Sequence, residues 1–295
     1  TFEDVQKLLS ERGVVRNTAS FRWVSEQKNY TNRIKSGRYL LENGMNNNEL
    51  VNLLRSGRQT PVNVVFNNVR TKEQFAGKIA DQLEIDSLDL LYAMTDTAFL
   101  NPLKLNIFNI SSLFIPNTYE FYWDISVPDF LARMEAEHHH FWSDERRAKA
   151  KKIDLSIEEV TILASIVEKE TLKNDEQPIV AGLYLNRLKK GMKLQSDPTV
   201  IYALGDFNIR RVLNKDLKID SPYNTYKYKG LPPGPISMPS IRAIDAVLNR
   251  VKHNYIFMCA KEDFSGYHNF ATTNKQHVKN ARRYRRALNQ KGISR

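Results

Sequence analysis

Two glutamates near the end of a predicted helix are the residues best suited to chemistry. Glu168 and Glu170 lie in the segment VEKET, residues 167–171. At about 100° per residue, they flank the apolar stripe of this helix on opposite sides, and Lys169 between them points to solvent. Because they do not converge, they cannot by themselves form an acid and base pair. A carboxylic acid that loses water beside an apolar stripe has a raised pKa, and a general acid needs one.

The helix that carries these glutamates has a well-defined start. Ser156 and Glu159 form the capping-box pattern S-x-x-E, and Leu155 and Val160 flank it as a hydrophobic staple. The pattern, which spans residues 155–172, predicts a helix that begins after Ser156. Many amphipathic helices carry structural glutamates beside their apolar face, and the helix alone favours that interpretation.

Stiff, polar loops follow this helix at residues 194–202, 221–226 and 230–236. Loops of Pro and Gly that carry Tyr, Asn and Thr suit sugar binding. Aromatic faces cover the apolar faces of sugars, and amides and hydroxyls match sugar hydroxyl groups. Ordinary stiff surface loops have the same composition, so the loops alone leave both interpretations open.

Six ordered motifs lie between residues 160 and 277. They are ASIVEKET at 164–171, NRL at 186–188, LQSDPTV at 194–200, YNTY at 223–226, GLPPGPI at 230–236, and HNF at 268–270 with Thr273 and His277. Together they resemble the YceG-like (MltG) family of bacterial endolytic murein transglycosylases. Weaker similarity to the family's LysM-like subdomain and to its segment entering the catalytic domain covers residues 34–39, 44–54 and 116–121.

The resemblance implies an enzyme that cleaves the glycan strands of peptidoglycan between N-acetylmuramic acid and N-acetylglucosamine. The family cleaves without water and leaves a 1,6-anhydro-muramoyl end, and its catalytic glutamate maps to Glu168. Many glycosidases need two carboxylates. Here the sugar's own C6 hydroxyl attacks, so one glutamate can act as acid and then as base, with no metal or cofactor. The alternative is a non-catalytic peptidoglycan-binding protein of the same fold, and the glutamate at position 168 argues against it.

Further motif positions are expected to line the glycan groove. Each of them could instead brace the loops. Glu170 points away from Glu168, and support of the site and a purely structural role are equally favoured for it. His268 could orient a sugar or be a structural histidine. These candidate substrate-binding residues are Gln195, Asp197, Asn224, Tyr226, Glu170 and His268.

The apolar pattern and the resemblance together predict an α+β fold in three parts. Residues 1–60 are expected to form a small LysM-like unit with two helices and two strands, one of them near 36–41. Residues 61–117 form a small α+β connecting segment, in which 95–117 is the expected hinge. Residues 118–295 form the larger α+β catalytic domain.

Positive charge is concentrated at the C-terminus. The chain has 295 residues, 44 Lys and Arg, 33 Asp and Glu, and a formal net charge of +11. Residues 275–295 contain eight Lys and Arg and no acid, which accounts for +8 of this charge. We expect this basic helix to have a solvated face that lies near an anionic lipid or polymer. Nucleic-acid binding is not expected, because only Tyr284 could stack on a base.

Other residues that could carry chemistry favour structural roles. Cys259 is the only cysteine, which excludes an intrachain disulfide and a cysteine-based zinc site, and we expect it to be buried and inert. The three histidines 138–140 point in different directions on a helix, so a metal site is not expected. Trp23, Trp123 and Trp142 are expected to pack in cores.

Membrane attachment is implied only by the resemblance. The sequence has no run of about 18 apolar residues and no signal-peptide pattern. It begins at Thr1, in what reads as the first turn of a helix, so we expect a preceding segment. The family has one N-terminal transmembrane anchor. It holds the catalytic part on the extracytoplasmic, periplasmic side of the bacterial inner (cytoplasmic) membrane, where the peptidoglycan synthesis machinery is an implied partner.

Overall fold

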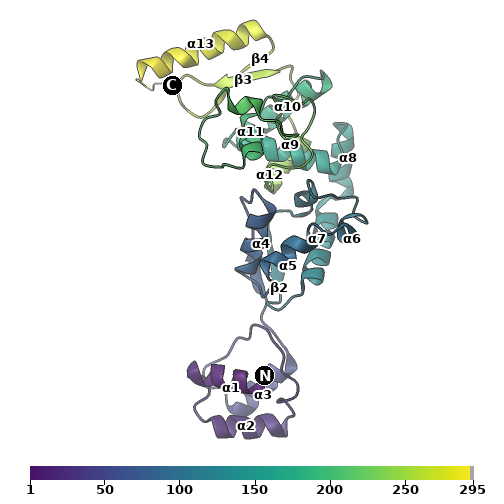
Figure 1. Cartoon of the computed structure of the whole chain (residues 1–295), viewed down its shortest axis with the longest axis vertical. Coiled ribbons are helices and arrows are strands. Elements are labelled where there is room, and N and C mark those ends of the chain that lie inside the picture. The colour runs from purple at the N-terminus through teal and green to yellow at the C-terminus, as the bar shows by residue number, and fades with distance from the viewer. Residues whose placement is uncertain (293–295) are drawn as a thin grey trace.

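The chain forms an elongated α+β structure with three units along its longest axis. The structure, a computed structural model, describes residues 1–292. The N-terminal helices lie at one end and α13 lies at the other (Figure 1). Helices predominate, and the strands of the described residues form two antiparallel pairs. None of the helices in this range is both long enough and apolar enough to cross a bilayer.

The N-terminal unit consists of three short helices around a small aromatic core. Phe2 stacks on Phe21 with ring centroids 5.8 Å apart, and Tyr30 packs edge-on against Phe2. Trp23 was expected in a core, but it is 63% exposed. The helices are α1 (Phe2–Glu11), α2 (Thr18–Gln27) and α3 (Asn47–Ser56).

The prediction of a strand near residues 36–41 is wrong. This segment has no strand partner and is a loop with an isolated backbone hydrogen bond, from Thr60 N–H to the Arg38 carbonyl at 2.8 Å. Residues 1–60 therefore contain three helices and no strand, instead of two helices and two strands. The LysM-like character of this unit stays a prediction.

The middle unit packs helices against a two-stranded sheet. Val62 of the first strand pairs with Phe121 of the second, and Val65 pairs with Thr118. The core is rich in aromatic rings, with Phe75 and Phe114 centroids 4.2 Å apart. The elements are β1 (Val62–Val65), α4 (Lys72–Ala80), α5 (Ser87–Ala93), α6 (Thr97–Leu100), the 3-10 turn η1 (Ile110–Leu113), β2 (Thr118–Phe121) and α7 (Val127–Phe141).

Residues 95–117 belong to this core and do not form the predicted hinge. Leu100, Ile110 and Phe114 from this stretch are fully buried. Short apolar runs between prolines can fill a core as well as link two units, and only the packing distinguishes the two cases. Because β1 pairs with β2, the core of the middle unit also crosses the boundary predicted at residue 117.

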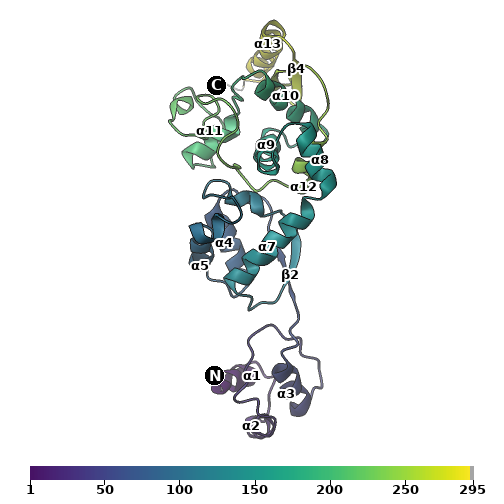
Figure 2. The same ribbon diagram turned by 90° about the vertical axis from the view of Figure 1, so that its right-hand side faces the viewer.

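Helix α7 joins the middle unit to the third unit. Its residues Phe130 and Met134 lie in the middle core, whereas Phe141 and the following Trp142 pack in the third core. Trp142 is 1% exposed, which confirms its predicted packing role. Figure 2 shows α7 rising from the middle unit toward α8. A continuous helix between two cores restricts bending at this junction.

The third unit is built around α9, whose residues 160–167 are all buried. Helices α10 and α12 pack against α9. The loops that precede α11 and α12 carry the YNTY and GLPPGPI motifs and the first three residues of LQSDPTV. The elements are α8 (Asp144–Lys152), α9 (Ile157–Glu170), α10 (Gln177–Lys189), α11 (Asp197–Leu204), the 3-10 turn η2 (Asp216–Lys218), α12 (Ile241–Leu248), β3 (Phe257–Ala260), β4 (His268–Ala271) and α13 (Asn274–Gln290).

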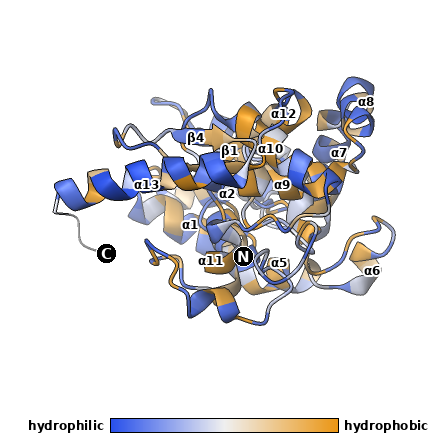
Figure 3. Ribbon diagram, turned by 90° about the horizontal axis from the view of Figure 1, so that it is seen from above, coloured by the Kyte–Doolittle hydropathy of each residue, from blue (hydrophilic) through white to orange (hydrophobic). Residues whose placement is uncertain are grey.

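The C-terminal helix lies on the β3–β4 hairpin. Phe257 pairs with Ala271 in this hairpin, and α13 contacts both strands. Helix α13 is mostly hydrophilic along its length (Figure 3). Cys259 lies in β3, and it is half-buried instead of buried as expected. Burial raises the pKa of its thiol, which keeps it protonated.

Candidate active site

Helix α9 positions both glutamates of the VEKET motif. Ser156 caps its N-terminus, and the reciprocal bonds between Ser156 and Glu159 confirm the predicted capping box. The helix ends at Glu170, after a turn in which Glu168, Lys169 and Glu170 are all partly exposed. The two glutamates contact different elements, as their spacing predicted.

Glu168 lies beside the start of α12. The backbone N–H of Ser240, the N-cap residue of α12, donates to Glu168 Oε1 at 3.1 Å. Within residues 1–292 this is the only hydrogen bond of the Glu168 side chain to another residue. One carboxyl oxygen is therefore held by the protein, and Oε2 is available to a ligand.

Lys169 does not point freely to solvent, contrary to the expectation. Its ammonium group donates to Oδ1 of Asn68 in the middle unit at 2.9 Å. Burial lowers the pKa of this ammonium group. Helical periodicity gives only the direction of a side chain from its own helix, and here another unit covers that direction. The end of α9 thus lies at the junction of the middle and third units.

Glu170 points into the third unit. Ser196 Oγ donates to Glu170 Oε2 at 2.9 Å. Burial raises the pKa of the Glu170 carboxyl, although hydrogen bonds from Ser196 and Tyr184 act in the opposite direction. Glu170 is thereby tied to the LQSDPTV loop, which fits the supporting role that the sequence left open.

Two of the predicted loops are joined by short hydrogen bonds. The Gln195 N–H donates to the Thr225 carbonyl at 3.1 Å, and the Ser196 N–H donates to Thr225 Oγ1 at 3.0 Å. The hydroxyls of Thr199 and Thr225 lie 2.8 Å apart. The LQSDPTV and YNTY motifs therefore form one structure, although they are almost 30 residues apart in sequence.

Asp197 and Tyr226 form the exposed part of this structure. The Tyr226 hydroxyl donates to Asp197 Oδ1 at 2.6 Å. Burial and the nearby Asp197 carboxylate raise the pKa of the Tyr226 hydroxyl, so it stays a hydrogen-bond donor. Asp197 also lies close enough to Glu170 for its charge to raise the pKa of that carboxyl. The structure thus brings together three of the predicted residues.

Gln195 is exposed and has a left-handed backbone. Its φ is +55°, which is uncommon for a residue other than glycine. Arg187, which is buried, donates from Nη1 to Gln195 Oε1 at 3.2 Å and to the Leu194 carbonyl at 2.7 Å. A buried guanidinium group therefore fixes this strained turn beside Glu170 and Asp197.

Asn224 is fully buried, and its bonds fit the bracing role that the sequence left open. Its Nδ2 donates to the carbonyls of Leu217 and Ile219 at 2.9 and 2.8 Å. Its Oδ1 accepts from the Tyr226 N–H at 3.0 Å. The amide thus shapes the loop that presents Tyr226.

His268 pairs with Glu176, a residue that the sequence reasoning missed. His268 Nδ1 lies 2.7 Å from Glu176 Oε2, and the His268 N–H donates to Glu176 Oε1 at 2.7 Å. Thr171 also donates to Glu176, at 2.9 Å. Only its position just after the VEKET motif could have drawn attention to Glu176. His268 and Glu176 fasten β4 to the loop that follows α9.

The described residues show no grouping that would hold a metal ion. Within residues 1–292, no three His, Cys, Asp or Glu side chains come together in a suitable cluster. His138 packs against Trp142 with ring centroids 6.4 Å apart. Burial lowers the pKa of His138 to about 4, so it is neutral at physiological pH.

Comparisons with known proteins identify relatives of this chain. A family model described as the YceG-like family matches residues 1–283. A protein of Bacillus subtilis named endolytic murein transglycosylase is 30% identical over 303 residues, covering 97% of this chain and 83% of that protein. A protein of the same name from Streptococcus pneumoniae is 27% identical, covering 88% of this chain and 52% of that longer protein.

A solved structure also resembles the chain over most of its length. The 2.6 Å crystal structure of a yceG-like protein from Listeria monocytogenes is 30% identical in sequence, with a TM-score of 0.63. The match covers 94% of each chain. Since the family model spans nearly all of the described residues, the chain belongs to the YceG-like family.

Proposed function

We propose that this chain is an endolytic peptidoglycan lytic transglycosylase. It cleaves the bond between N-acetylmuramic acid and N-acetylglucosamine within glycan strands and leaves 1,6-anhydro-muramoyl ends. The curated relatives named endolytic murein transglycosylase support this activity. The observation that carries the proposal is the set of contacts at the end of α9. Glu168 keeps one carboxyl oxygen available, whereas its neighbours Lys169 and Glu170 are hydrogen-bonded to other residues.

Glu168 is the proposed catalytic residue. The Ser240 N–H holds Oε1, which orients the carboxyl and leaves Oε2 free to act on the sugar. In the first half of the reaction Glu168 protonates the glycosidic oxygen as the bond to C1 breaks. In the second half it accepts the proton of the C6 hydroxyl as that oxygen bonds to C1. The carboxyl group of Glu168 ends in its starting protonation state. The reaction therefore needs no second carboxylate and consumes no water.

The exposed polar groups are the proposed glycan contacts. Gln195, Asp197 and Tyr226 lie on the joined loops beside α9, with their polar groups at least partly open to solvent. Asn224, Glu170 and His268 hold these loops and β4 in place, although they too were candidates for sugar contact. We therefore assign glycan binding to Gln195, Asp197 and Tyr226, and structural support to Asn224, Glu170 and His268.

Mass spectrometry of purified, uncrosslinked glycan strands tests the proposal. The unaltered chain should produce internal fragments that end in 1,6-anhydro-muramoyl, and Glu168→Gln should reduce their formation by at least about 10³-fold. Glu120→Gln is the matched control, because Glu120 is exposed on β2. This variant should cleave at the unaltered rate.

The other results would assign the chemistry differently. Loss of cleavage in Glu170→Gln but not in Glu168→Gln would make Glu170 the acid. Hydrolysed reducing ends would indicate a hydrolase with a second carboxylate, and Asp197 would be the first candidate. Glycan binding without cleavage by any of the proteins would indicate a non-catalytic peptidoglycan-binding protein.

We also propose that the full-length protein has one transmembrane anchor ahead of residue 1. The third unit would then act on the extracytoplasmic side of the cytoplasmic membrane, close to the peptidoglycan synthesis machinery. The family resemblance supports both the anchor and this location. In cells, the full-length protein should stay in the membrane fraction after a high-salt wash, and protease added to spheroplasts should digest it. Recovery in the soluble fraction would contradict the anchor.

A further inference from the structure

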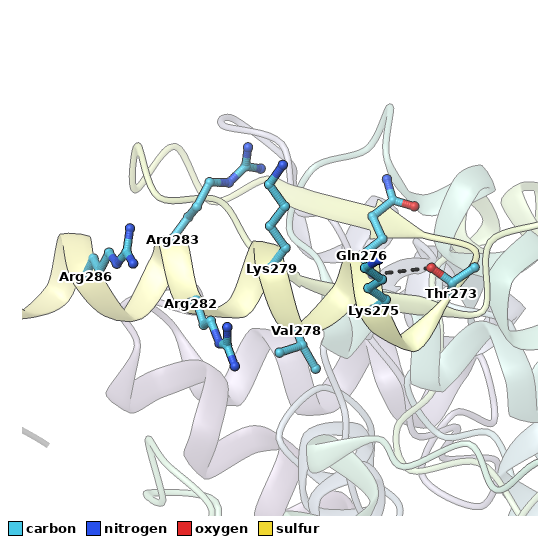
Figure 4. A pocket seen from close by; sticks show the side chains of 8 residues that line it. All are labelled: Thr273, Lys275, Gln276, Val278, Lys279, Arg282, Arg283 and Arg286. Atoms are coloured by element: carbon cyan, nitrogen blue, oxygen red, sulfur yellow. Dashed lines mark hydrogen bonds between the residues drawn. The ribbon is translucent and has the colours of Figure 1, made fainter.

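Four cations form a straight stripe along α13. Lys275, Lys279, Arg282 and Arg286 are spaced by four, three and four residues. At about 100° per residue, all four lie within an arc of about 60°, and at 1.5 Å per residue they extend over about 16 Å. Figure 4 shows these side chains along one open pocket on the helix, together with Gln276 and Arg283. We refer to the four residues as the α13 stripe.

The α13 stripe faces away from the rest of the molecule. The opposite side of the helix packs on the hairpin, where His277 stacks on Phe257 with centroids 5.2 Å apart. About two turns further along, Tyr284 packs against Phe264 with ring centroids 5.9 Å apart. The helical angle of His277 and Tyr284 is about 180° from that of the stripe. An extended ligand could therefore lie along the stripe without displacing any part of the fold.

The protein does not neutralise the α13 stripe. Within residues 1–292, none of its four cations forms an ion pair with a carboxylate. The adjacent Arg283 is different, because its Nε lies 3.2 Å from Glu262 Oε1. Like charges one turn apart destabilise a helix. A bound polyanion would remove this repulsion.

We propose that the α13 stripe binds a linear phosphodiester polymer of the cell envelope, laid along the helix. One cation per turn presents repeated charges in a line, and a chain with one phosphate in each short repeat has matching geometry. Arg and Lys are the side chains best suited to phosphate oxygens. This partner depends on the proposed function, which places the third unit at the cell wall. The polymer would hold the enzyme beside its glycan substrate.

A membrane surface is a less suitable partner. An interfacial helix needs large apolar side chains on the face that enters the lipid. The only apolar residue lining this pocket is Val278. The stripe also lies at the opposite end of the molecule from the N-terminus, where the anchor is proposed (Figure 1).

This face of α13 offers no stacking group to the bases of a nucleic acid. Base recognition uses aromatic or base-reading side chains. The aromatic rings between residues 275 and 286 belong to His277 and Tyr284, and they are turned toward Phe257 and Phe264. The stripe thus offers charge contacts and no base contacts.

Binding of a synthetic poly(glycerol phosphate) to the complete 295-residue chain tests the proposal. By fluorescence anisotropy, affinity should fall roughly 50- to 150-fold between about 50 and 200 mM salt, as expected for four phosphate contacts. The variant K275Q/K279Q/R282Q/R286Q should lose this affinity to the level of uncharged polyglycerol. The charge-conserving variant K275R/K279R/R282K/R286K should retain it.

A second variant controls for total charge. R12Q/R16Q/K151Q/K152Q removes four exposed cations elsewhere and should bind the polymer as the unaltered chain does. Equal loss in the stripe and control variants, or no binding by the unaltered chain, would overturn the proposal. Tighter binding to anionic vesicles or to duplex DNA of equal charge would also overturn it, in favour of that partner.

Glycan cleavage is measured separately, so the two proposals can fail independently. The stripe variant should cleave purified, polymer-free glycan strands at the unaltered rate, because the stripe is not part of the proposed active site. Circular dichroism should show an intact α13, since the substitutions remove only repulsive charges. Polymer binding without cleavage would contradict the proposed function, whereas cleavage without polymer binding would contradict the role of the stripe.

Discussion

His268 and Glu176 form a nearly buried pair that connects β4 to the loop after α9. The His268 Nδ1 atom lies 2.7 Å from Glu176 Oε2, and the two side chains are 15% and 3% exposed. Burial lowers the pKa of the imidazole, but the hydrogen bond and the charge of Glu176 outweigh it and raise this pKa above its ordinary 6.5. Burial acts to raise the pKa of Glu176, but its bonds from His268 lower it below 4.5.

Together the two pKa shifts predict that this pair stabilises the fold most between pH 4.5 and pH 6.5. The contribution of His268 is complete below pH 6.5 and is lost as the pH rises through its raised folded-state pKa. The contribution of Glu176 is complete above pH 4.5 and is lost as the pH falls through its lowered folded-state pKa. Within this window, His268→Gln should lower the free energy of unfolding by about 2 kcal/mol, and by less at about pH 8.5. Urea unfolding across pH measures this difference.

His140→Gln is the control for that experiment. His140 is exposed at the end of α7, so the substitution should leave the unfolding free energy unchanged across the same pH range. An equal effect of His268→Gln at both ends of the pH range would show that the ion pair does not contribute.

Glu170→Gln should stabilise the chain at neutral pH. Burial in the folded state raises the pKa of Glu170. Its contribution to the free energy of unfolding is therefore most favourable below its ordinary pKa of 4.5 and is lost as the pH rises. A neutral amide avoids this loss and can still accept a hydrogen bond from Ser196. We expect a melting temperature roughly 2–4 °C higher at pH 7.5, about 1 kcal/mol for a domain of 150–250 residues, and little change near pH 4. Exposed Glu120→Gln should have no effect at either pH, and destabilisation by Glu170→Gln at pH 7.5 would refute the argument.

Gln195 should respond to substitution according to its backbone angle. At φ +55°, a β-branched side chain is strongly disfavoured, so Gln195→Val should cost about 2 kcal/mol of unfolding free energy. Gln195→Gly relieves the strain but loses the contact with Arg187, and its net effect should lie within about 1 kcal/mol. Thermal unfolding of both variants provides the comparison. If valine were tolerated as well as glycine, the left-handed turn would not be present in solution.

Asp124 should fix the orientation of the N-terminal unit. Its carboxylate accepts from Ser36 Oγ at 3.0 Å and from Gln59 Nε2 at 2.8 Å, which joins the N-terminal and middle units. Asp124→Ala should broaden the distribution of distances in small-angle X-ray scattering, with a change of at most about 1 kcal/mol in unfolding free energy. Exposed Asp81→Ala is the control and should leave the scattering unchanged. Identical scattering from all three proteins would mean that other contacts set this orientation.

Local patterns in the sequence predicted the helix that carries the site. The bonds between Ser156 and Glu159 that start α9 join residues three positions apart, so the sequence contains both partners side by side. The same reasoning placed Glu168 and Glu170 on different sides of the helix. The motifs also indicated that the loops around Asp197 and Tyr226 belong to one site.

Only the tertiary structure decided which distant residues meet. The strand expected near residues 36–41 has no partner, and residues 95–117 fill a core where a hinge was expected. Lys169 reaches Asn68, 101 residues away, and His268 reaches Glu176, 92 residues away. Such contacts depend on how whole units pack, because burial and hydrogen bonding across units are not set by the residues next to each partner in the sequence. The sequence therefore determined the α9 helix and the candidate acid, whereas the fold determined which groups hold that acid and which oxygen it leaves available.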